Sequence, residues 1–336
     1  MGDGGKENDK ELLTFSLASF FNDLGSDMIY PVWPLFVTSF LGANMFILGL
    51  IDGIGETIAA LSKALSGYFS DKTGKRKVFI WIGYFMSFAS RLGYAASSLW
   101  WHLIPFKVLD RAGKIRGAPR DAIVADISKE NRGRNFGILR TMDNLGAVCG
   151  VLLCLFLMQF FSLKTILMIA AVPSLLSVAM IVLFIKEGRR GEVKRVSLSL
   201  FDRNFKIFLI SAVFLSLATF SYSFLLIFVK NAGFPDMMLP VFYLLFTFIA
   251  AIASYPAGRL SDMLGSKRML YVSMIIYSLM LVGFIYTRQL WLFFMLFILY
   301  GLFKGIVDTV QSSFAASLSP KDMKATGIGS LQLIIG

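Results

Sequence analysis

Long apolar runs, separated by short polar segments, recur along the whole chain and constrain its fold more than any other feature. A helix needs about 20 mainly apolar residues to cross the hydrocarbon core of a bilayer. The runs cover residues 12–41, 44–69, 78–98, 100–124, 135–161, 163–186, 205–230, 237–258, 269–287 and 289–315, and a further one begins near Ala325. This pattern predicts an all-α polytopic membrane protein.

The basic residues predict how the chain is oriented in the membrane. The net charge is +12, although only 16% of residues are charged, against about 25% in soluble proteins. With the N-terminus in the cytoplasm, the outside segments contain only Lys164, Lys230 and Arg288, and the other basic residues between the runs lie inside. Because cytoplasmic loops are enriched in Lys and Arg, we expect a multi-pass protein of the cell membrane with a cytoplasmic N-terminus. This distribution argues against nucleic acid as a partner.

Cysteine and histidine indicate no metal or disulfide site. Cys149 and Cys154 lie in one apolar run, and His102 is the sole histidine of the sequence. The cysteines are better interpreted as small residues that face lipid or protein than as a disulfide or a metal pair. The sequence also lacks H-E-x-x-H, G-x-S-x-G and phosphate-binding loop motifs. We therefore expect neither an enzyme nor a resident metal or cofactor.

A polar stretch from Lys186 to Lys206 divides the chain. It is the longest such stretch and contains seven Lys or Arg residues. We interpret residues 187–204 as a solvated, basic cytoplasmic linker near anionic lipid headgroups. The predicted domains are then an N-terminal bundle, residues 1–186, and a C-terminal bundle, residues 205–336.

An internal repeat relates two short loops that follow the second and the eighth run. The first loop reads Gly67-Tyr-Phe-Ser-Asp71-Lys72-Thr-Gly74-Lys75-Arg76, and the second reads Gly258-Arg-Leu-Ser-Asp262-Met263-Leu-Gly265. Both glycines and the aspartate of the first loop have counterparts 191 residues later. A duplicated six-helix unit explains this constant offset.

The first loop resembles the signature loop of the major facilitator superfamily (MFS), and other segments are similar to its prokaryotic multidrug-efflux-like and uncharacterised members. The second loop is less similar, because Met263 replaces a basic residue. The resemblance implies two six-helix bundles, of which about ten and a half of twelve helices are expected before Gly336. Asp71 can face a helix N-terminus, and the family implies that this contact latches the two bundles on the cytoplasmic side. The alternative is a polar loop that only sets orientation.

Ionisable residues also occur within the apolar runs. A charge at the centre of a spanning helix costs about 2.5–3.5 kcal/mol on insertion scales, so these residues must pair, lie off-centre or line a hydrated space. Asp23 and Asp27 are one helical turn apart, and Asp52, Glu56 and Lys63 share one helix face. The residues interpreted as lying well inside the runs are Asp23, Asp27, Asp52, Glu56, Lys63, Arg91, Asp110, Arg111, Asp143, Lys304 and Asp308.

The first eight of these residues, from Asp23 to Arg111, are the candidates for a transport pathway. One hypothesis is that Asp23, Asp27, Asp52 or Glu56 takes up and releases a proton while Arg91 or Arg111 moves closer or farther away. The alternative is a fixed network of ion pairs that holds the first bundle together.

The second half has fewer charges and many aromatic residues, which predict either contact with an apolar substrate or ordinary packing against protein and lipid. They include Phe220, Tyr222, Phe224, Tyr243, Phe246 and Phe248.

The glycines Gly137, Gly146 and Gly150 resemble the pattern of the superfamily's antiporters, although Val151 stands where those have proline. Close helix packing is the alternative explanation. From the resemblance and the repeat we expect a secondary active transporter that moves a small organic solute by alternating access. We expect it to be proton-coupled, to work as an efflux antiporter and to be a monomer. A proton-coupled uptake symporter and a non-transporting membrane sensor remain alternatives.

Overall fold

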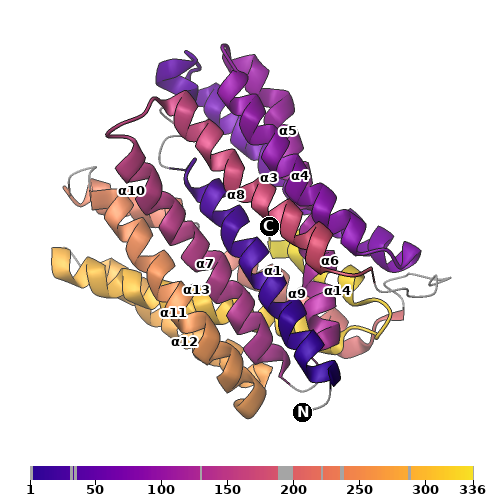
Figure 1. Ribbon diagram of the computed structural model, residues 1–336. Coiled ribbons are helices and arrows are strands. Elements are labelled where there is room, and N and C mark those ends of the chain that lie inside the picture. The colour runs from indigo at the N-terminus through magenta and orange to yellow at the C-terminus, as the bar shows by residue number, and fades with distance from the viewer. Residues whose placement is uncertain are drawn as a thin grey trace.

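The computed structural model describes residues 3–30, 33, 36–128, 131–187, 200–220, 222–234, 238–286 and 289–335. These residues form helices and no strand, which confirms the all-α prediction for this part of the chain. Figure 1 shows long helices that run side by side. The elements are α1 (Asp3–Asp27), η1 (Phe36–Phe40), α3 (Met45–Thr73), α4 (Lys77–Ala96), η2 (Trp100–His102), α5 (Leu103–Ala112), η3 (Gly113–Arg116), α6 (Gly117–Ile127), α7 (Arg132–Leu157), α8 (Leu163–Phe184), α9 (Arg203–Ala218), α10 (Tyr222–Asn231), α11 (Leu239–Leu264), α12 (Ser266–Tyr286), α13 (Leu290–Leu318) and α14 (Lys324–Ile335).

Two glycines of the repeated loop end equivalent helices. Gly74 follows α3 with a φ angle of 69°, and Gly265 follows α11 with a φ angle of 92°. Glycine adopts such positive φ angles readily, whereas residues with a Cβ atom are strained there. We call the end of the molecule where α3 and α11 finish the motif end. The opposite end, where α3 begins after Asn44, is the far end.

Within the described residues, five helices are long and apolar enough to cross a membrane by length and composition, namely α7, α8, most of α11, α12 and α13. Three other predicted runs are interrupted in the structure. The run 12–41 is broken after Asp27, 205–230 is divided between α9 and α10, and 100–124 contains the short turn η3. The helix α1 begins at Asp3, so it extends beyond the N-terminal end of the predicted apolar run, which begins at residue 12.

Backbone partners explain where the interruptions fall. The sequence has prolines at positions 31 and 34, which lack the N–H that a continuing helix would need. Between α9 and α10, the backbone N–H of Phe220 donates to the Tyr277 hydroxyl at 2.7 Å instead of to a helical carbonyl. At the polar start of α1, the Asn8 amide donates to the Ile127 carbonyl at 3.4 Å, which ties this extra length to α6.

The apolar cores join the first half of the chain (α1 to α8) to the second half (α9 to α14) at the motif end only. One core combines residues of both halves, among them Phe15 and Phe205. A second core lies within the first half around Met28, and a third lies within the second half around Phe297. Among the described residues, the halves therefore share a core near the motif end and have separate cores toward the far end.

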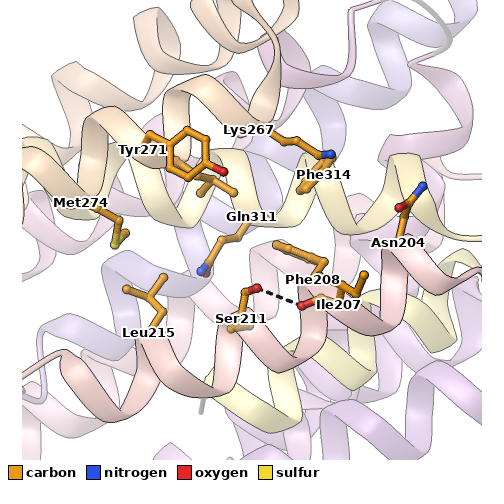
Figure 2. A pocket seen from close by; sticks show the side chains of 12 residues that line it. Asn204, Ile207, Phe208, Ser211, Leu215, Lys267, Tyr271, Met274, Gln311 and Phe314 are labelled. Carbon is orange, nitrogen blue, oxygen red and sulfur yellow. Dashed lines mark hydrogen bonds between the residues drawn. The ribbon is translucent and has the colours of Figure 1, made fainter.

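An apolar groove of about 290 Å³ lies between α9, α12 and α13. Figure 2 shows Leu215, Met274 and Phe314 around it, with Lys267 and Asn204 near one end. With the offset of 191 residues, α9 and α12 correspond to α1 and α4, and both of these pack against α8. The groove therefore has the place in the second half that α8 takes in the first half.

Candidate functional site

The Asp71 carboxylate binds the N-terminus of α14 across the two halves. Its Oδ2 atom accepts hydrogen bonds from the Thr326 backbone N–H at 2.7 Å and from the Thr326 hydroxyl at 2.9 Å. A carboxylate at a helix N-terminus satisfies unpaired N–H groups and interacts favourably with the helix dipole. Gly67 allows this approach, since a Cβ atom there would collide with the carbonyl of Ala325.

Asp262 makes the equivalent contact at the other edge of the motif end. Its two oxygens accept from the backbone N–H groups of Gly133 at 2.7 Å and Arg134 at 2.8 Å, at the start of α7. Gly258 again permits the approach, because a Cβ atom there would collide with the Gly133 carbonyl. The sequence offset is thus reproduced as two carboxylates that each bind a helix N-terminus of the opposite half.

The two contacts differ in their surrounding charges. Arg76 lies 2.8 Å from Asp71 and 2.6 Å from Asp126, and Asp126 lies 2.6 Å from Lys324 of the second half. The three basic residues of this loop were expected to stay in water or at headgroups; Lys72 and Lys75 are exposed, whereas Arg76 is buried because it pairs with Asp71 and Asp126. Asp262 has no such ion pair in the described residues. We call the Asp71 contact with its charged neighbours the charged latch, and the Asp262 contact the neutral latch.

A second group of buried charges lies within the first half. Arg120 and Arg140 both pair with Asp121 and with Asp143, at distances between 2.7 and 3.4 Å. Two arginines and two aspartates compensate one another, which a buried charge requires.

This four-charge network also reaches the second half. Asp121 accepts from the Gln332 side chain at 3.3 Å, and Arg140 donates to the Ser312 hydroxyl at 3.2 Å. Of the four charges, only Asp143 was predicted from the sequence as a candidate. The signal was present, because Arg120, Asp121 and Arg140 lie inside runs that were assigned to the membrane.

Two further ion pairs lie toward the far end of the first half. Asp52 is 2.7 Å from Lys107, and Glu56 is 3.2 Å from Arg111. In both pairs the acid is the exposed partner: the side chains of Asp52 and Glu56 are 45% and 58% exposed, against 8% and 12% for Lys107 and Arg111. The sequence predicted the two acids and Arg111 but missed Lys107. Lys63, from the same predicted face, has no ion pair in the described part of the chain.

Asp27 forms a hydrogen bond to the opposite half, away from the two latches at the motif end. Its Oδ1 atom accepts from the hydroxyl of Tyr243 on α11 at 3.2 Å, and Asp27 is only 8% exposed. Asp23, one turn earlier on α1, accepts from the Asn22 amide at 2.9 Å. Neither acid forms a salt bridge among the described residues. The sequence predicted both acids, whereas the Tyr243 contact joins residues 216 positions apart.

Arg91 lies behind these acids and is held by neutral groups. Its guanidinium donates to the Asn22 carbonyl at 3.1 Å, the Ser26 hydroxyl at 2.6 Å and the Ala170 carbonyl at 3.0 Å, and it also contacts the Ser174 hydroxyl. The side chain is fully buried and ties α1, α4 and α8 together. This placement differs from that of Arg111, which is paired with a carboxylate.

Asp110 lies beside Arg111. It is 3.7 Å from the Arg111 Nε atom, and its other contact is with the Ser90 hydroxyl at 3.5 Å. Of the predicted candidates, the structure pairs Arg111 with both Glu56 and Asp110, and it pairs Asp52 with Lys107. It leaves Asp23, Asp27, Lys63 and Arg91 outside these ion pairs.

The aromatic residues of the second half divide into two groups. Tyr222, Tyr243 and Phe246 form one cluster, with ring centroids 5.1 to 5.8 Å apart. Phe220 and Phe248 are exposed and lie outside that cluster, and the side chain of Phe224 is outside the described residues. Lys304 and Asp308 of α13 form a half-exposed pair at 3.2 Å.

The three predicted glycines lie at close helix contacts. A Cβ atom at Gly137 would collide with the Ser254 carbonyl of α11 at 2.6 Å. At Gly146 and Gly150 it would collide with the carbonyls of Phe20 and Leu24 on α1.

Within the described residues, no group of three or more His, Cys, Asp or Glu residues is arranged to hold a metal ion.

Several known proteins with similar sequences are described as transporters. An uncharacterised MFS-type transporter of Methanocaldococcus jannaschii is 33% identical over 98% of this chain and 87% of its own length. The multi-drug resistance efflux pump PmrA of Streptococcus pneumoniae is 25% identical over 78% of this chain and 70% of its own.

A solved structure supports the fold. The human organic anion transporter TETRAN superimposes with a TM-score of 0.79 over 97% of this chain and 90% of its own, at 15% identity. The family model that describes the Major Facilitator Superfamily matches residues 15–336. The chain therefore has the all-α fold of that superfamily and belongs to the Major Facilitator Superfamily, a family of multi-pass membrane transporters.

Proposed function

We propose that this protein is a proton-coupled secondary transporter that exports a small organic solute in exchange for protons. The two halves, residues 1–186 and 205–336, move against each other as bundles, and residues 187–204 connect them. Most of that connecting segment, residues 188–199, lies outside the described residues. The protein acts as a monomer in the cell membrane, with the motif end and the N-terminus in the cytoplasm.

The hydrogen bond between Asp27 and Tyr243 carries this proposal. Asp27 is buried, and its single hydrogen-bond partner among the described residues belongs to the opposite half. Rocking of the halves would remove this partner and change the surroundings of the carboxylate. Hydrogen bonding, burial and nearby charges set the proton affinity of an acid, so the same motion would load or release a proton.

The charged groups around Asp27 come from several helices. Asp23 lies on the same helix, Lys114 on η3 and Arg91 on α4, in addition to the Tyr243 hydroxyl on α11. The sequence suggested that Arg91 or Arg111 moves relative to the acids. Because Arg91 is fixed by its neutral partners, we propose instead that Tyr243 moves relative to Asp27.

The two latches support alternating access. The halves share a core and both latches at the motif end, whereas their cores separate toward the far end. We propose that this arrangement is the state closed to the cytoplasm. Breaking the latches while closing the far end would expose the same central residues to the other side of the membrane. The similarity to an efflux pump favours export as the direction.

Proton flux in proteoliposomes tests the proposal. Purified protein is reconstituted with a pH-sensitive dye inside, and a panel of cationic, neutral and anionic solutes is added under an imposed pH gradient. A transported solute should cause proton movement, and Asp27→Asn should abolish that movement while solute counterflow continues. Asp322→Asn is the matched control, because Asp322 is exposed between α13 and α14.

Each alternative has its own outcome. Proton movement in the same direction as the solute would indicate a symporter. Absence of counterflow with every solute would favour a sensor. Unchanged proton flux in both Asp27→Asn and Asp23→Asn would refute coupling through these acids.

A further inference from the structure

We propose that Glu187, the first residue of the connecting segment 187–204, is a positioning residue of the charged latch. It holds the backbone of Arg76 so that the guanidinium of this arginine can bind two acids at once. Glu187 lies beyond the end of α8, outside the repeat and outside the apolar runs. The inference goes beyond the proposed transport function, because it depends neither on the solute nor on the coupling ion.

The start of α4 lacks the residues that usually cap a helix. Its N-cap position is Arg76, whose side chain makes no capping hydrogen bond, and its first turn contains no acid. Lys75 and Lys77 flank this arginine, so three consecutive cations lie at the positive end of the helix dipole. Cations are unfavourable there, and the first backbone N–H groups of a helix need acceptors. The start of α4 therefore requires an anion from elsewhere in the chain.

Glu187 supplies this anion from 111 positions farther along the sequence. Its Oε1 atom accepts hydrogen bonds from the backbone N–H groups of Arg76 at 2.7 Å and Lys77 at 3.1 Å. The contact is reciprocal, because the Lys77 ammonium donates to the Val182 carbonyl in the last turn of α8 at 2.9 Å. A carboxylate thus binds the N-terminus of α4 and an ammonium binds the C-terminus of α8, as the two helix dipoles favour.

Arg76, which Glu187 holds, is also the centre of the charged latch. Its side chain is 7% exposed and lies 2.8 Å from Asp71 and 2.6 Å from Asp126. Asp71 presents its other oxygen to Thr326 of the second half. Asp126 presents its other oxygen to Lys324 of the second half. Two nitrogens of one planar group serve the two acids, so the position of the Arg76 backbone decides whether both pairs form together.

The clamp should matter most in the closed state. There the guanidinium is buried between two acids, whereas in the open state water can replace them. Ordering an arginine and the loop residue that carries it costs conformational entropy, and Glu187 reduces this cost by fixing Arg76 in advance. Because Glu187 is where the first half passes into the connecting segment, a displacement of this junction would release Arg76 and favour opening.

Spin-label distances in lipid nanodiscs test the inference without solute or gradient. Lys72 and Lys321, exposed on opposite halves at the motif end, are replaced by spin-labelled cysteine after the two native cysteines are removed. Glu187→Ala should raise the ratio of open to closed protein about three- to tenfold, the size expected for loss of a helix cap. Glu187→Gln keeps the oxygen but loses the charge, and it should raise the ratio by less.

The matched control is Lys186→Ala. Lys186 adjoins Glu187, and its pair with Glu7 is exposed on both sides. Exposed pairs contribute little, so this variant should keep the wild-type ratio.

A second background shows whether the effect passes through the arginine. In Arg76→Gln, further substitution of Glu187 by alanine should open the protein no further. Asp262→Asn should still open it, because the neutral latch is separate.

Two results would overturn the inference. One is an unchanged distance distribution in Glu187→Ala, even with a lower unfolding temperature, because Glu187 would then cap α4 without acting on the latch. The other is equal further opening by Glu187→Ala with and without Arg76. Proton flux has no part in these measurements, so failure of the transport proposal would leave the role of Glu187 standing, and the reverse also holds.

Discussion

Removing the charge of Asp71 should open the motif end. In Asp71→Asn, the amide keeps one acceptor oxygen but loses the ion pair with Arg76 and the negative charge at the start of α14. The Asp71 side chain has no exposed surface, so Arg76 would be left with Asp126 alone. Breaking a buried ion pair by removing one partner costs about 3–5 kcal/mol. Asp71 and Arg76 belong to the same half, so this cost falls on the closed state, where both are buried, and is relieved when opening lets water reach Arg76. At about 1.4 kcal/mol per factor of ten, the closed state should lose roughly a hundredfold or more in population relative to the open state.

The neutral latch provides an internal comparison. Asp262→Asn loses one of two charge-assisted hydrogen bonds to α7 and no ion pair among the described residues. We expect it to cost about 1–3 kcal/mol, less than Asp71→Asn. The order of the two effects therefore follows from the asymmetry of the latches.

Spin-label distances measure both effects. Lys72 and Lys321 are exposed on opposite halves at the motif end, and each is replaced by cysteine in a background without Cys149 and Cys154. Double electron–electron resonance should show a new, longer distance in Asp71→Asn and a smaller population of it in Asp262→Asn. An unchanged distance distribution in Asp71→Asn, or a larger change in Asp262→Asn, would refute the reasoning.

Three further substitutions test separate contacts. Gly258→Ala should force α11 away from the Gly133 carbonyl and increase the open population in the same measurement, by about 1–3 kcal/mol as for other overpacked sites; no change would contradict the close contact. Arg91→Lys should lower the free energy of unfolding in detergent by about 2–4 kcal/mol, because several buried acceptors lose their donor; an unaltered unfolding curve would show that these bonds contribute nothing net. Lys324→Ala should open the motif end less than Asp71→Asn, since Asp126 keeps Arg76, and a larger opening would contradict that order.

The repeat made part of the site predictable from the sequence. Asp71 and Asp262 share an offset of 191 residues, and the structure gives both the same contact with a helix N-terminus. Local chemistry sufficed here because glycine and aspartate have few roles at the end of a helix. The interrupted helices were less predictable: the break after Asp27 precedes two prolines, but the break at Phe220 depends on a distant hydroxyl from Tyr277.

The spacing of residues in the sequence could not predict which side chains of the two halves would meet. Helical periodicity placed Asp27 on the same face as Asp23, yet it could not show that Tyr243 would lie opposite. Periodicity also gave no basis for distinguishing Arg91, which binds neutral groups, from Arg111, which binds carboxylates. Such distinctions depend on which helices become neighbours, and the pairing of helices is a property of the whole fold.

The glycines of α7 have a consequence for the lifetime of its contacts. Gly137 touches α11 of the opposite half, whereas Gly146 and Gly150 touch α1 of its own half. The early turns of α7 thus pack against the opposite half, and its later turns pack against its own half. In the proposed transport cycle, the first contact would break and re-form while the second stays closed. Alanine at Gly137 should therefore alter how often the protein opens, and alanine at Gly146 should alter whether it folds.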